Sequence, residues 1–240
     1  MKHLRFESID STNTFLKAHF LEYPSFQVVS AAHQTSGKGR MGHVWIDDGT
    51  QALFSILIKD ESLRQHIEIL PFLTAKILHE SFHEIIPSLQ IKWPNDLLAH
   101  GRKLAGILVE TIVEDGAIVA AVVGIGLNVN TKTFPKELEG IATSIRLETH
   151  KETDPIHWVQ HIASRLETAW KSHGFDDVIP YCNHHSFLKG KPVSTVQNGH
   201  LLFGTAGAIQ PDGTLEVSIE QGLFHVRSGE VNWLKNKDAK

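Results

Sequence analysis

A short stretch of the chain, residues 30–45, holds the residue types best suited to bind an anion. They are Gly37, Lys38, Gly39, Arg40, Gly42 and Trp45. Glycine lets backbone N–H groups come close to a ligand, and lysine and arginine pair with phosphate or carboxylate. A tryptophan ring offers a flat face to a heterocycle. We therefore predict a mobile flap that closes over an anion joined to a ring, with a solvated basic loop as the alternative.

The stretch does not match the common phosphate-binding loops. A Walker loop has a glycine five residues before its Gly-Lys pair and Ser or Thr after the lysine, whereas this chain has Ala32 and Gly39 there. Gly124-Ile125-Gly126 likewise lacks the third glycine of a dinucleotide fingerprint. Any phosphate site must therefore be built in another way.

Three further clusters of polar residues could join the flap. Ser11-Thr12-Asn13 offers hydroxyls and an amide at a helix start. The segment from Lys92 to Asp96 combines a cation, an aromatic ring, an amide and a carboxylate, and Lys103 begins a strand in which Gly106 leaves room for a ligand. Each cluster also has a plain structural interpretation, as a helix cap, a tight turn or a solvated strand end.

The composition excludes several classes of protein. Of the 240 residues, 41% are hydrophobic, as in an ordinary globular core, and the net charge of −4 gives no attraction to nucleic acid or an anionic membrane. The single cysteine, Cys182, excludes an internal disulfide, and no segment resembles a signal peptide or a membrane span. We expect a soluble cytoplasmic protein with no nucleic-acid or membrane partner.

The elements that must position these clusters follow from hydrophobic patterning. The predicted strands cover residues 26–31, 52–58, 103–113 and 117–124, and the predicted helices cover 12–20, 63–86 and 155–174. Ser11 or Asp10 would cap the first helix, and Asp154 the last. Asp115-Gly116 predicts a hairpin between the last two strands.

The pattern changes near residue 186. Short apolar runs then alternate with turn sequences at intervals of about ten residues. The turns are Asn198-Gly199, Asp212-Gly213 and Gln221-Gly222. We predict a small β-barrel over residues 186–236, following an α+β domain over residues 1–185.

The predicted helix over 63–86 contains His79-Glu80-Ser81-Phe82-His83, which matches the zinc-protease pattern. At helical pitch both histidines lie opposite the apolar stripe of Leu70, Ile77 and Ile85, so we expect them to face solvent. No third zinc ligand is obvious. We interpret the match as a coincidence and predict no metal site.

Taken together, the clusters resemble the biotin protein ligases. The matching segments are Ser11 to Asn13, Gln34 to Trp45, Lys92 to Leu97, Arg102 to Glu110 and Gly124 to Val129. They occur in the family's order and spacing, and the resemblance covers residues 4–235. It implies an α+β fold, with the mixed sheet and helices of class II aminoacyl-tRNA synthetases and biotin ligases, followed by an SH3-like β-barrel. Because the match begins at the fourth residue, we expect no N-terminal DNA-binding domain.

The resemblance implies an ATP-dependent ligase. The carboxylate of biotin would attack the α-phosphate of ATP, giving biotinyl-5′-AMP and pyrophosphate, and a lysine of a biotin carboxyl carrier domain would then take the biotinyl group. A closing flap would shield the adenylate from water. Mg²⁺ would bridge the phosphates. The protein would be a monomer or a homodimer.

The resemblance also implies roles for individual residues. Lys103, Arg40 and Lys38 would stabilise charge in the reaction, and Asp96 would orient or deprotonate the incoming lysine. The residues expected at biotin are Ser11, Thr12, Asn13, Gln34, Gly37, Lys38, Gly39, Arg40, Lys103, Gly106, Leu108 and Gly124. Those expected at ATP are Arg40, Trp45, Asn95, Lys103, Gly126 and Asn128.

Two positions depart from the family's pattern, because Lys38 and His43 stand where arginines are usual. Lysine cannot form a bidentate fork and histidine is mostly neutral at pH 7, so we expect weaker closure of the flap. Two alternative functions stay open. One is a lipoate or octanoyl ligase of the same superfamily, and the other is a non-catalytic protein that binds biotin or its adenylate.

Overall fold

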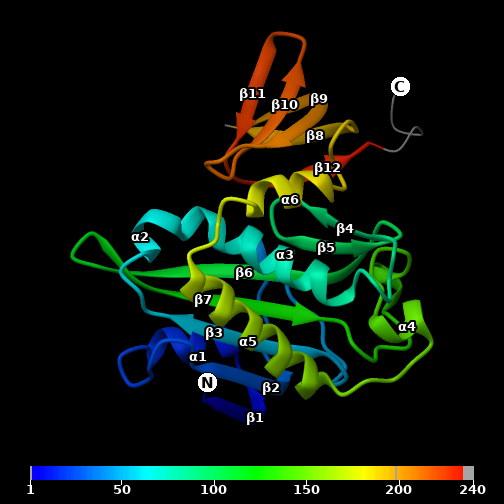
Figure 1. Cartoon of the computed structure of the whole chain (residues 1–240). Coiled ribbons are helices and arrows are strands. Elements are labelled where there is room, and N and C mark those ends of the chain that lie inside the picture. The colour runs from blue at the N-terminus through cyan, green and yellow to red at the C-terminus, as the bar shows by residue number, and fades with distance from the viewer. Residues whose placement is uncertain (1, 198, 235–240) are drawn as a thin grey trace.

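The computed structural model of the chain describes residues 2–197 and 199–234. Its largest element is a seven-stranded sheet with the order β1-β2-β3-β7-β6-β5-β4 (Figure 1). The strands are β1 (His3–Ile9), β2 (Val28–Gln34), β3 (Ala52–Ile58), β4 (Leu89–Lys92), β5 (Asp96–Ala99), β6 (Arg102–Glu114) and β7 (Ala117–Leu127). Strands β1 and β2 are parallel and the other neighbours are antiparallel. The mixed sheet of the α+β prediction is confirmed.

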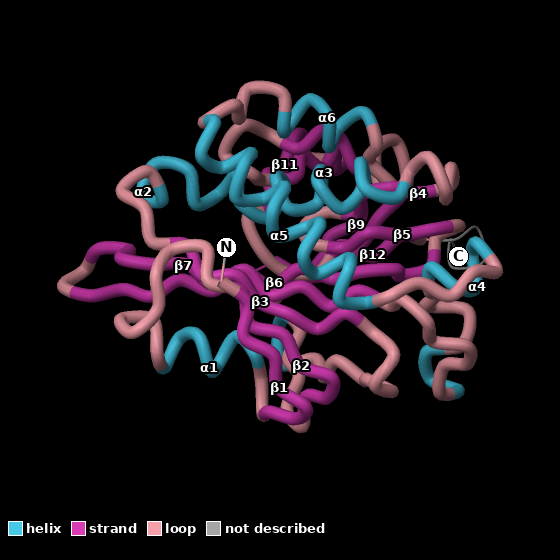
Figure 2. The backbone as a smooth tube through the Cα atoms, turned by 60° about the horizontal axis from the view of Figure 1, so that its bottom comes forward, coloured by secondary structure: helices cyan, strands magenta, loops and turns pink. Residues whose placement is uncertain are grey.

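Helices cover both faces of this sheet. Helices α3 (Leu70–Phe82) and α5 (Pro155–Ser172) lie across one face, and α1 (Thr12–Ala18) lies against the other (Figure 2). Strand β3 is buried on both sides, since Phe54 packs in the larger core with α3 and α5 while Leu57 packs with Leu16 of α1. A strand covered on both faces has no solvent-facing side, which explains its nearly continuous apolar sequence.

The sequence located helix starts better than it located helix interruptions. Ser11 caps α1 and Asp154 caps α5, as predicted. The single helix predicted over 63–86 is wrong, because the segment consists of α2 (Leu63–His66), a 3-10 turn (Ile67–Ile69) and α3. Pro71 lacks an N–H group and therefore occupies the first turn of a new helix.

Three further short helical segments were not predicted from the sequence. They are α4 (Ile145–Thr149), α6 (Val178–His184) and a 3-10 turn (Lys136–Leu138). None of the helices in the described residues is both long enough and apolar enough to cross a membrane.

The chain after α6 forms a second sheet, drawn in orange and red at the top of Figure 1. Its strands are β8 (Pro192–Gln197), β9 (His200–Ile209), β10 (Leu215–Ile219), β11 (Gly222–Val226) and β12 (Val231–Trp233), in the order β11-β10-β9-β8-β12. Within the described residues β11 and β12 do not pair, so the sheet is open where a closed barrel was predicted. Of the predicted turns, Asp212-Gly213 and Gln221-Gly222 do join strands, whereas Asn198 lies outside the described residues.

One continuous apolar core joins the two sheets, from Phe26 to Val231. Directed bonds reinforce the packing. The indole of Trp93, only 1% exposed, donates its N–H to the carbonyl of Gly213 at 2.9 Å. The side chain of Asn183 both donates to and accepts from the backbone of Ile209. The second sheet is therefore fixed against the first.

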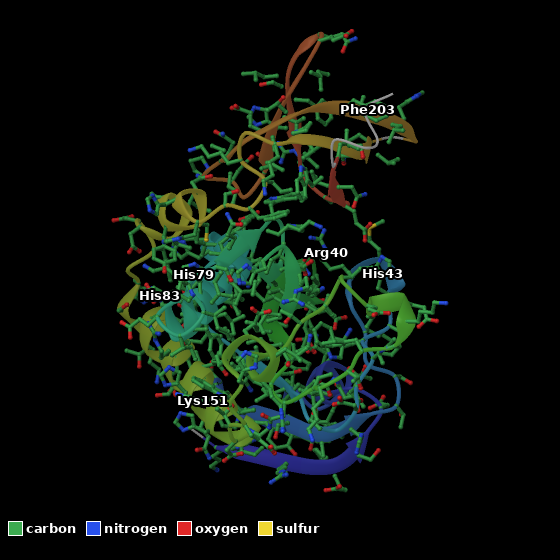
Figure 3. The ribbon with its side chains drawn as sticks, turned by 90° about the vertical axis from the view of Figure 1, so that its right-hand side faces the viewer. Arg40, His43, His79, His83, Lys151 and Phe203 are labelled. Atoms are coloured by element: carbon green, nitrogen blue, oxygen red, sulfur yellow. The ribbon has the colours of Figure 1, made fainter. Side chains whose placement is uncertain are left out.

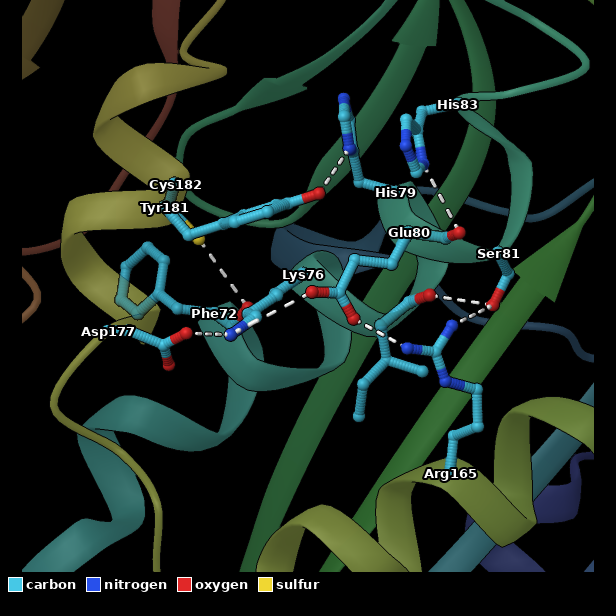
Figure 4. Close-up of polar contacts among 11 residues, drawn as sticks. Phe72, Lys76, His79, Glu80, Ser81, His83, Arg165, Asp177, Tyr181 and Cys182 are labelled. Carbon is cyan, nitrogen blue, oxygen red and sulfur yellow. Dashed lines mark hydrogen bonds and ion pairs between the residues drawn. The ribbon is translucent and has the colours of Figure 1, made fainter.

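The zinc-protease pattern begins in α3, and its first histidine, His79, is buried beside this core (Figure 4). The expectation that His79 faces solvent is wrong, because the unpredicted helix α6 covers it and leaves it 2% exposed. Its Nε2 lies 3.2 Å from the carbonyl of Leu89 and its Nδ1 lies 2.9 Å from the hydroxyl of Tyr181. A carbonyl can only accept, so Nε2 carries the proton and Nδ1 accepts from Tyr181.

The residues around this histidine have other partners in the fold. Burial, together with His185 and His83, lowers the pKa of His79 to about 4. Glu80 pairs with Arg165 at 2.6 Å, and His83 remains exposed. Within the part of the chain that the structure describes, no group of three or more His, Cys, Asp or Glu could hold a metal ion.

Candidate active site

The flap, the start of α1, strands β6 and β7 and the loop before β12 enclose a cavity of about 330 Å³. The predicted site residues that line it are Ser11, Thr12, Asn13, Gln34, Lys38, Gly39, Arg40, Trp45, Asn95, Asp96, Lys103, Gly106, Leu108, Gly124 and Gly126. Of the predicted set, Gly37 and Asn128 do not line it. The structure therefore brings separate segments of the sequence to one place.

Glycines form the floor of the cavity where β6 and β7 run side by side. Gly106 and Gly126 are partners in the register of the two strands. A methyl group at Gly126 would come within 2.6 Å of the Trp45 ring, and one at Gly106 within 2.9 Å of the Lys103 side chain. These glycines are needed for space, because the ring and the lysine lie directly on the backbone.

Contacts within its own backbone hold the two sides of the flap together. Lys38 pairs with Val44 as an isolated antiparallel bridge, and the N–H of Trp45 donates to the carbonyl of Gly37 at 3.0 Å. A 3-10 turn, η1 (Arg40–Gly42), reverses the chain between them. Gly37 thus supports the base of the flap instead of lining the cavity. Movement of the flap stays a prediction.

Positive charge dominates the lining. The cations Lys38, Arg40, Lys92 and Lys103 outnumber the carboxylates Asp96 and Glu230. The Nζ atom of Lys103 lies 2.7 Å from Asp96 Oδ1, a close ion pair without hydrogen-bond alignment, and 5.5 Å from the centre of the Trp45 ring. Burial lowers the pKa of Arg40, and the carboxylates of Asp96 and Glu230 oppose that effect. This set of cations can hold an anionic ligand.

The C-terminal sheet supplies a wall of the cavity that the sequence analysis missed. It consists of Gly229, Glu230, Val231 and Asn232. Oε1 of Glu230 lies 2.8 Å from Nε2 of His43, which ties the flap to the loop before β12. Figure 3 shows Arg40 and His43 beneath the C-terminal sheet. No local pattern marks Glu230, because 187 positions separate it from His43.

The opposite end of the cavity is formed by buried polar groups of α1. Thr12 and Asn13 are 3% and 5% exposed, and Oε1 of Gln34 accepts from the N–H of Thr12 at 2.7 Å. Two residues that the sequence analysis missed, Ser55 and Glu110, hydrogen-bond to Asn13 from behind. A signal for the first was available, since Ser55 is the one polar residue in the apolar run of β3.

The two asparagines predicted to lie near the nucleotide differ. Asn95 lines the cavity, and its Nδ2 donates to the carbonyl of Ile107 at 2.7 Å. Asn128 is 4% exposed and lies outside the lining. Its Nδ2 donates to the carbonyls of Thr143 at 3.0 Å and Lys103 at 3.4 Å. Asn128 therefore anchors the backbone of Lys103, and the structure does not place its amide at the ligand.

The fold and the cavity agree with the result of comparison with protein families. The model of the biotin/lipoate A/B protein ligase family matches residues 5–128, just over half of the chain. The chain therefore belongs to this family, and the resemblance inferred from its motifs is confirmed. The matched region holds the flap, Lys103 and the glycine floor.

Individual relatives are similar over longer stretches. The bifunctional ligase/repressor BirA of Bacillus spizizenii is 29% identical over 241 residues, which cover 96% of this chain and 74% of that protein. The biotin–[acetyl-CoA-carboxylase] ligase of Paracoccus denitrificans is 29% identical over 212 residues, covering 85% of this chain and 88% of that one. The biotin protein ligase from Aquifex aeolicus, solved in complex with biotin and ATP, shares the fold with a TM-score of 0.81 at 24% identity, covering 98% of this chain and 99% of that one.

Proposed function

We propose that the chain is an ATP-dependent ligase that converts biotin into biotinyl-5′-AMP and transfers biotin to a specific lysine of a biotin carboxyl carrier domain. The observation that carries the proposal is the cavity itself. One cavity holds a buried polar end at Thr12 and Asn13, an aromatic ring on a glycine floor and the cations Lys103 and Arg40. The Paracoccus denitrificans relative, which is named for biotin ligation, supports the choice of biotin within the family.

In the first step, an oxygen of the biotin carboxylate forms a bond to the α-phosphorus of ATP. The bond from that phosphorus to the bridging oxygen of pyrophosphate breaks. Lys103 and Arg40 stabilise the negative charge of the phosphoryl group as it transfers, and Lys38 adds its charge from the flap. Trp45 stacks on the adenine, next to Gly126 and Asn95.

In the second step, the amine of the acceptor lysine attacks the carbonyl carbon of the adenylate and AMP leaves. An acceptor lysine is mostly an ammonium ion at neutral pH, so it must lose a proton before it attacks. Asp96 is the carboxylate next to Lys103, at 2.7 Å, and we assign to it the role of orienting or deprotonating the incoming lysine. The flap keeps water from the adenylate meanwhile.

Mg²⁺ is proposed to accompany ATP. The two carboxylates of the lining, Asp96 and Glu230, are not a dedicated metal cage. Asp96 Oδ1 already has a cation beside it, since Lys103 Nζ lies 2.7 Å away, so any contact of Asp96 with Mg²⁺ would use its other carboxylate oxygen. Phosphate oxygens and water would provide the other ligands, which is how Mg²⁺ is commonly held in nucleotide sites.

The domain organisation is proposed on the same basis. Residues 1–185 would form the catalytic domain and residues 186–236 an SH3-like module, of which 235 and 236 lie outside the described residues. The module would take part in catalysis through Glu230 and its neighbours in the cavity wall. We propose a cytoplasmic monomer or homodimer, a setting that suits the free and buried Cys182.

A transfer assay tests the proposal. A purified carrier domain is incubated with the protein, ATP and either biotin, lipoic acid or octanoic acid, and its mass is measured. We expect the added mass of one biotinyl group and no addition from the other acids. Addition of lipoyl or octanoyl alone would make the protein a lipoate-type ligase. Failure to release pyrophosphate from ATP and biotin would make it a non-catalytic binding protein.

A further inference from the structure

A chain of hydrogen bonds runs behind the buried end of the cavity and connects three structural elements. It joins Glu110 of β6 to Asn13 of α1, Asn13 to Ser55 of β3, and Ser55 to Thr12. Thr12 lines the cavity, whereas Ser55 and Glu110 do not. We infer that Glu110 and Ser55 are positioning residues that fix the direction of the Thr12 hydroxyl and thereby the polarity of the biotin end of the site. The identity of the ligand rests on the proposed function.

The first link sets the orientation of Asn13. Its Nδ2 donates to Oε2 of Glu110 at 2.8 Å and to the carbonyl of Leu108 at 3.3 Å. Burial alone would raise the pKa of Glu110, but hydrogen bonds from Lys17 and Asn13 outweigh it and leave the pKa below its ordinary value. A carboxylate and a carbonyl can only accept. The amide nitrogen of Asn13 must therefore face β6, and its oxygen must face β3.

The second link, from Asn13 through Ser55 to Thr12, follows because the Ser55 hydroxyl has only one hydrogen to donate. Oδ1 of Asn13 only accepts, so Ser55, 2.5 Å away, donates its single hydroxyl hydrogen there. Gly124 leaves the necessary room, since a methyl group at that position would lie 2.3 Å from Asn13 Oδ1. Ser55 then has no hydrogen left for Thr12. Its Oγ must accept from the Thr12 hydroxyl, which lies 2.6 Å away.

Thr12 has one competing acceptor, Oε1 of Gln34, at 3.2 Å. The shorter contact decides between the two, because 2.6 Å between Thr12 and Ser55 without a hydrogen would place two sets of lone pairs against each other. Oε1 of Gln34 is already satisfied by the N–H of Thr12 at 2.7 Å. The Thr12 hydroxyl therefore points its hydrogen away from the cavity and its remaining lone pair toward the ligand.

This polarity selects a ligand group that donates. Thr12 accepts, while the Nε2 of Gln34 is left to donate because its Oε1 is occupied. A cyclic urea offers N–H donors beside a carbonyl acceptor and matches this arrangement, whereas the dithiolane ring of lipoic acid has no polar hydrogen. The ionised Glu110 thus contributes to the choice of substrate although it does not contact it.

Isothermal calorimetry on the full chain, with biotin alone and with ATP alone, tests the inference. The variants are Glu110→Gln, Ser55→Ala and the double variant, and the matched control is Lys17→Met, which removes the other partner of Glu110 and leaves the bond to Asn13. Glu110→Gln should weaken biotin about tenfold or more, because the Lys17 ammonium attracts the single amide oxygen and the new NH2 group then faces the NH2 group of Asn13. Ser55→Ala should weaken it as much, since it removes a hydrogen bond to a buried polar group. Affinity for ATP should stay within about twofold.

The biotin affinity of the double variant is the decisive measurement. If Glu110 and Ser55 act through the same chain of hydrogen bonds, the second substitution adds little to the first. We expect the double variant to be no more than about threefold weaker for biotin than Glu110→Gln. If the losses of biotin affinity multiply in the double variant, the two residues act independently and the inference is overturned. A loss of biotin affinity in Lys17→Met equal to that in Glu110→Gln would also overturn it. If Glu110→Gln does not fold, Ser55→Ala decides, and an unchanged biotin affinity in it overturns the inference alone. No biotin binding by the natural sequence would overturn the proposed function and this inference with it.

Discussion

The two ends of the cavity differ in burial, because one is a buried hydrogen-bond network and the other is an exposed flap. At the end beside α1, where we propose that biotin binds, Thr12, Asn13 and Ser55 are at most 5% exposed and bonded to one another and to Glu110. At the flap end, Met41 and Val44 are 71% and 75% exposed. The flap is held by bonds within its own backbone and, outside itself, by the exposed pair of His43 with Glu230 and by the Trp45 ring, which lies on the glycine floor.

This difference separates two tasks that one site must perform. A buried network in which every hydrogen is assigned cannot reorganise cheaply, so it suits recognition of a fixed ring. A surface segment with few buried contacts opens at low cost, so it suits the role we propose for the flap, which is to admit ATP and release the product. Lys103 lies between the two ends, on the floor, where it can contact the groups that each end brings.

Removal of Lys103 should have the largest effect, because both ends position ligands against it. Lys103→Ala should slow adenylate formation about a hundredfold or more, as loss of a charge-stabilising donor does. Pyrophosphate release measures the rate. Lys132→Ala, an exposed lysine outside the cavity, is the matched control. A rate for Lys103→Ala equal to that of the control would show that Lys103 does not stabilise charge during adenylate formation.

The buried His79 makes the free energy of unfolding depend on pH, so the two ends of the cavity should be compared where the fold is fully stable. Its folded pKa of about 4 lies below the ordinary value of 6.5, so the unfolded chain binds the proton more readily. The associated stability is complete above about pH 6.5 and is lost as the pH falls through 4, up to about 3 kcal/mol in all. Urea unfolding between pH 7 and 4 measures it. In His79→Gln the dependence should be shallower, and an equal slope would assign it to other groups.

Trp45 should distinguish the two ligands. If it stacks on adenine, Trp45→Ala should weaken ATP by about 1–3 kcal/mol and leave biotin nearly unchanged. Calorimetry with each ligand alone provides both values. Gly126→Ala is a useful companion, because its methyl group would displace the Trp45 ring, which it would approach to 2.6 Å. Equal losses for ATP and biotin would make Trp45 a structural support of the whole cavity.

The smallest expected effect concerns closure of the flap. Lys38→Arg combined with His43→Arg should slow release of free biotinyl-adenylate about two- to fivefold, because arginine adds a fixed charge and a second hydrogen bond toward phosphate or Glu230. Labelling of bystander lysines measures the leak. The same pair of changes in a Glu230→Gln background shows whether the C-terminal sheet is the partner. An unchanged leak would leave retention to Arg40 and Lys103.

The sequence predicted this arrangement where the signal was local. The nearly continuous apolar strand over 52–58 and the caps Ser11 and Asp154 were confirmed, and most residues of the predicted motifs line one cavity. What it missed depends on contacts between distant segments. His79 was expected in solvent because α6 was not predicted to cover it, and Glu230 joins the cavity only through the packing of two sheets.

The sequence also does not show whether a polar side chain contacts a ligand or another part of the protein. Asn128 sits in a matching motif, yet its amide is taken by backbone carbonyls of Thr143 and Lys103. Ser55 has no motif at all, yet it is central to the hydrogen-bond chain. Only coordinates reveal which partner a polar side chain has, because several partners lie within reach of any motif.

The wall formed by Gly229 to Asn232 has a consequence for the life of the protein in a cell. About 100 residues separate it from Gly126, the last residue of the floor along the chain. A ribosome adding about 5–20 residues per second needs roughly 5–20 s to make that segment. During this interval the nascent chain carries the flap, the floor and Lys103 without the wall against which the flap rests. Under the proposed function, a growing chain lacks the Glu230 partner of the flap until translation is nearly complete, and retention of an adenylate through this contact begins only then.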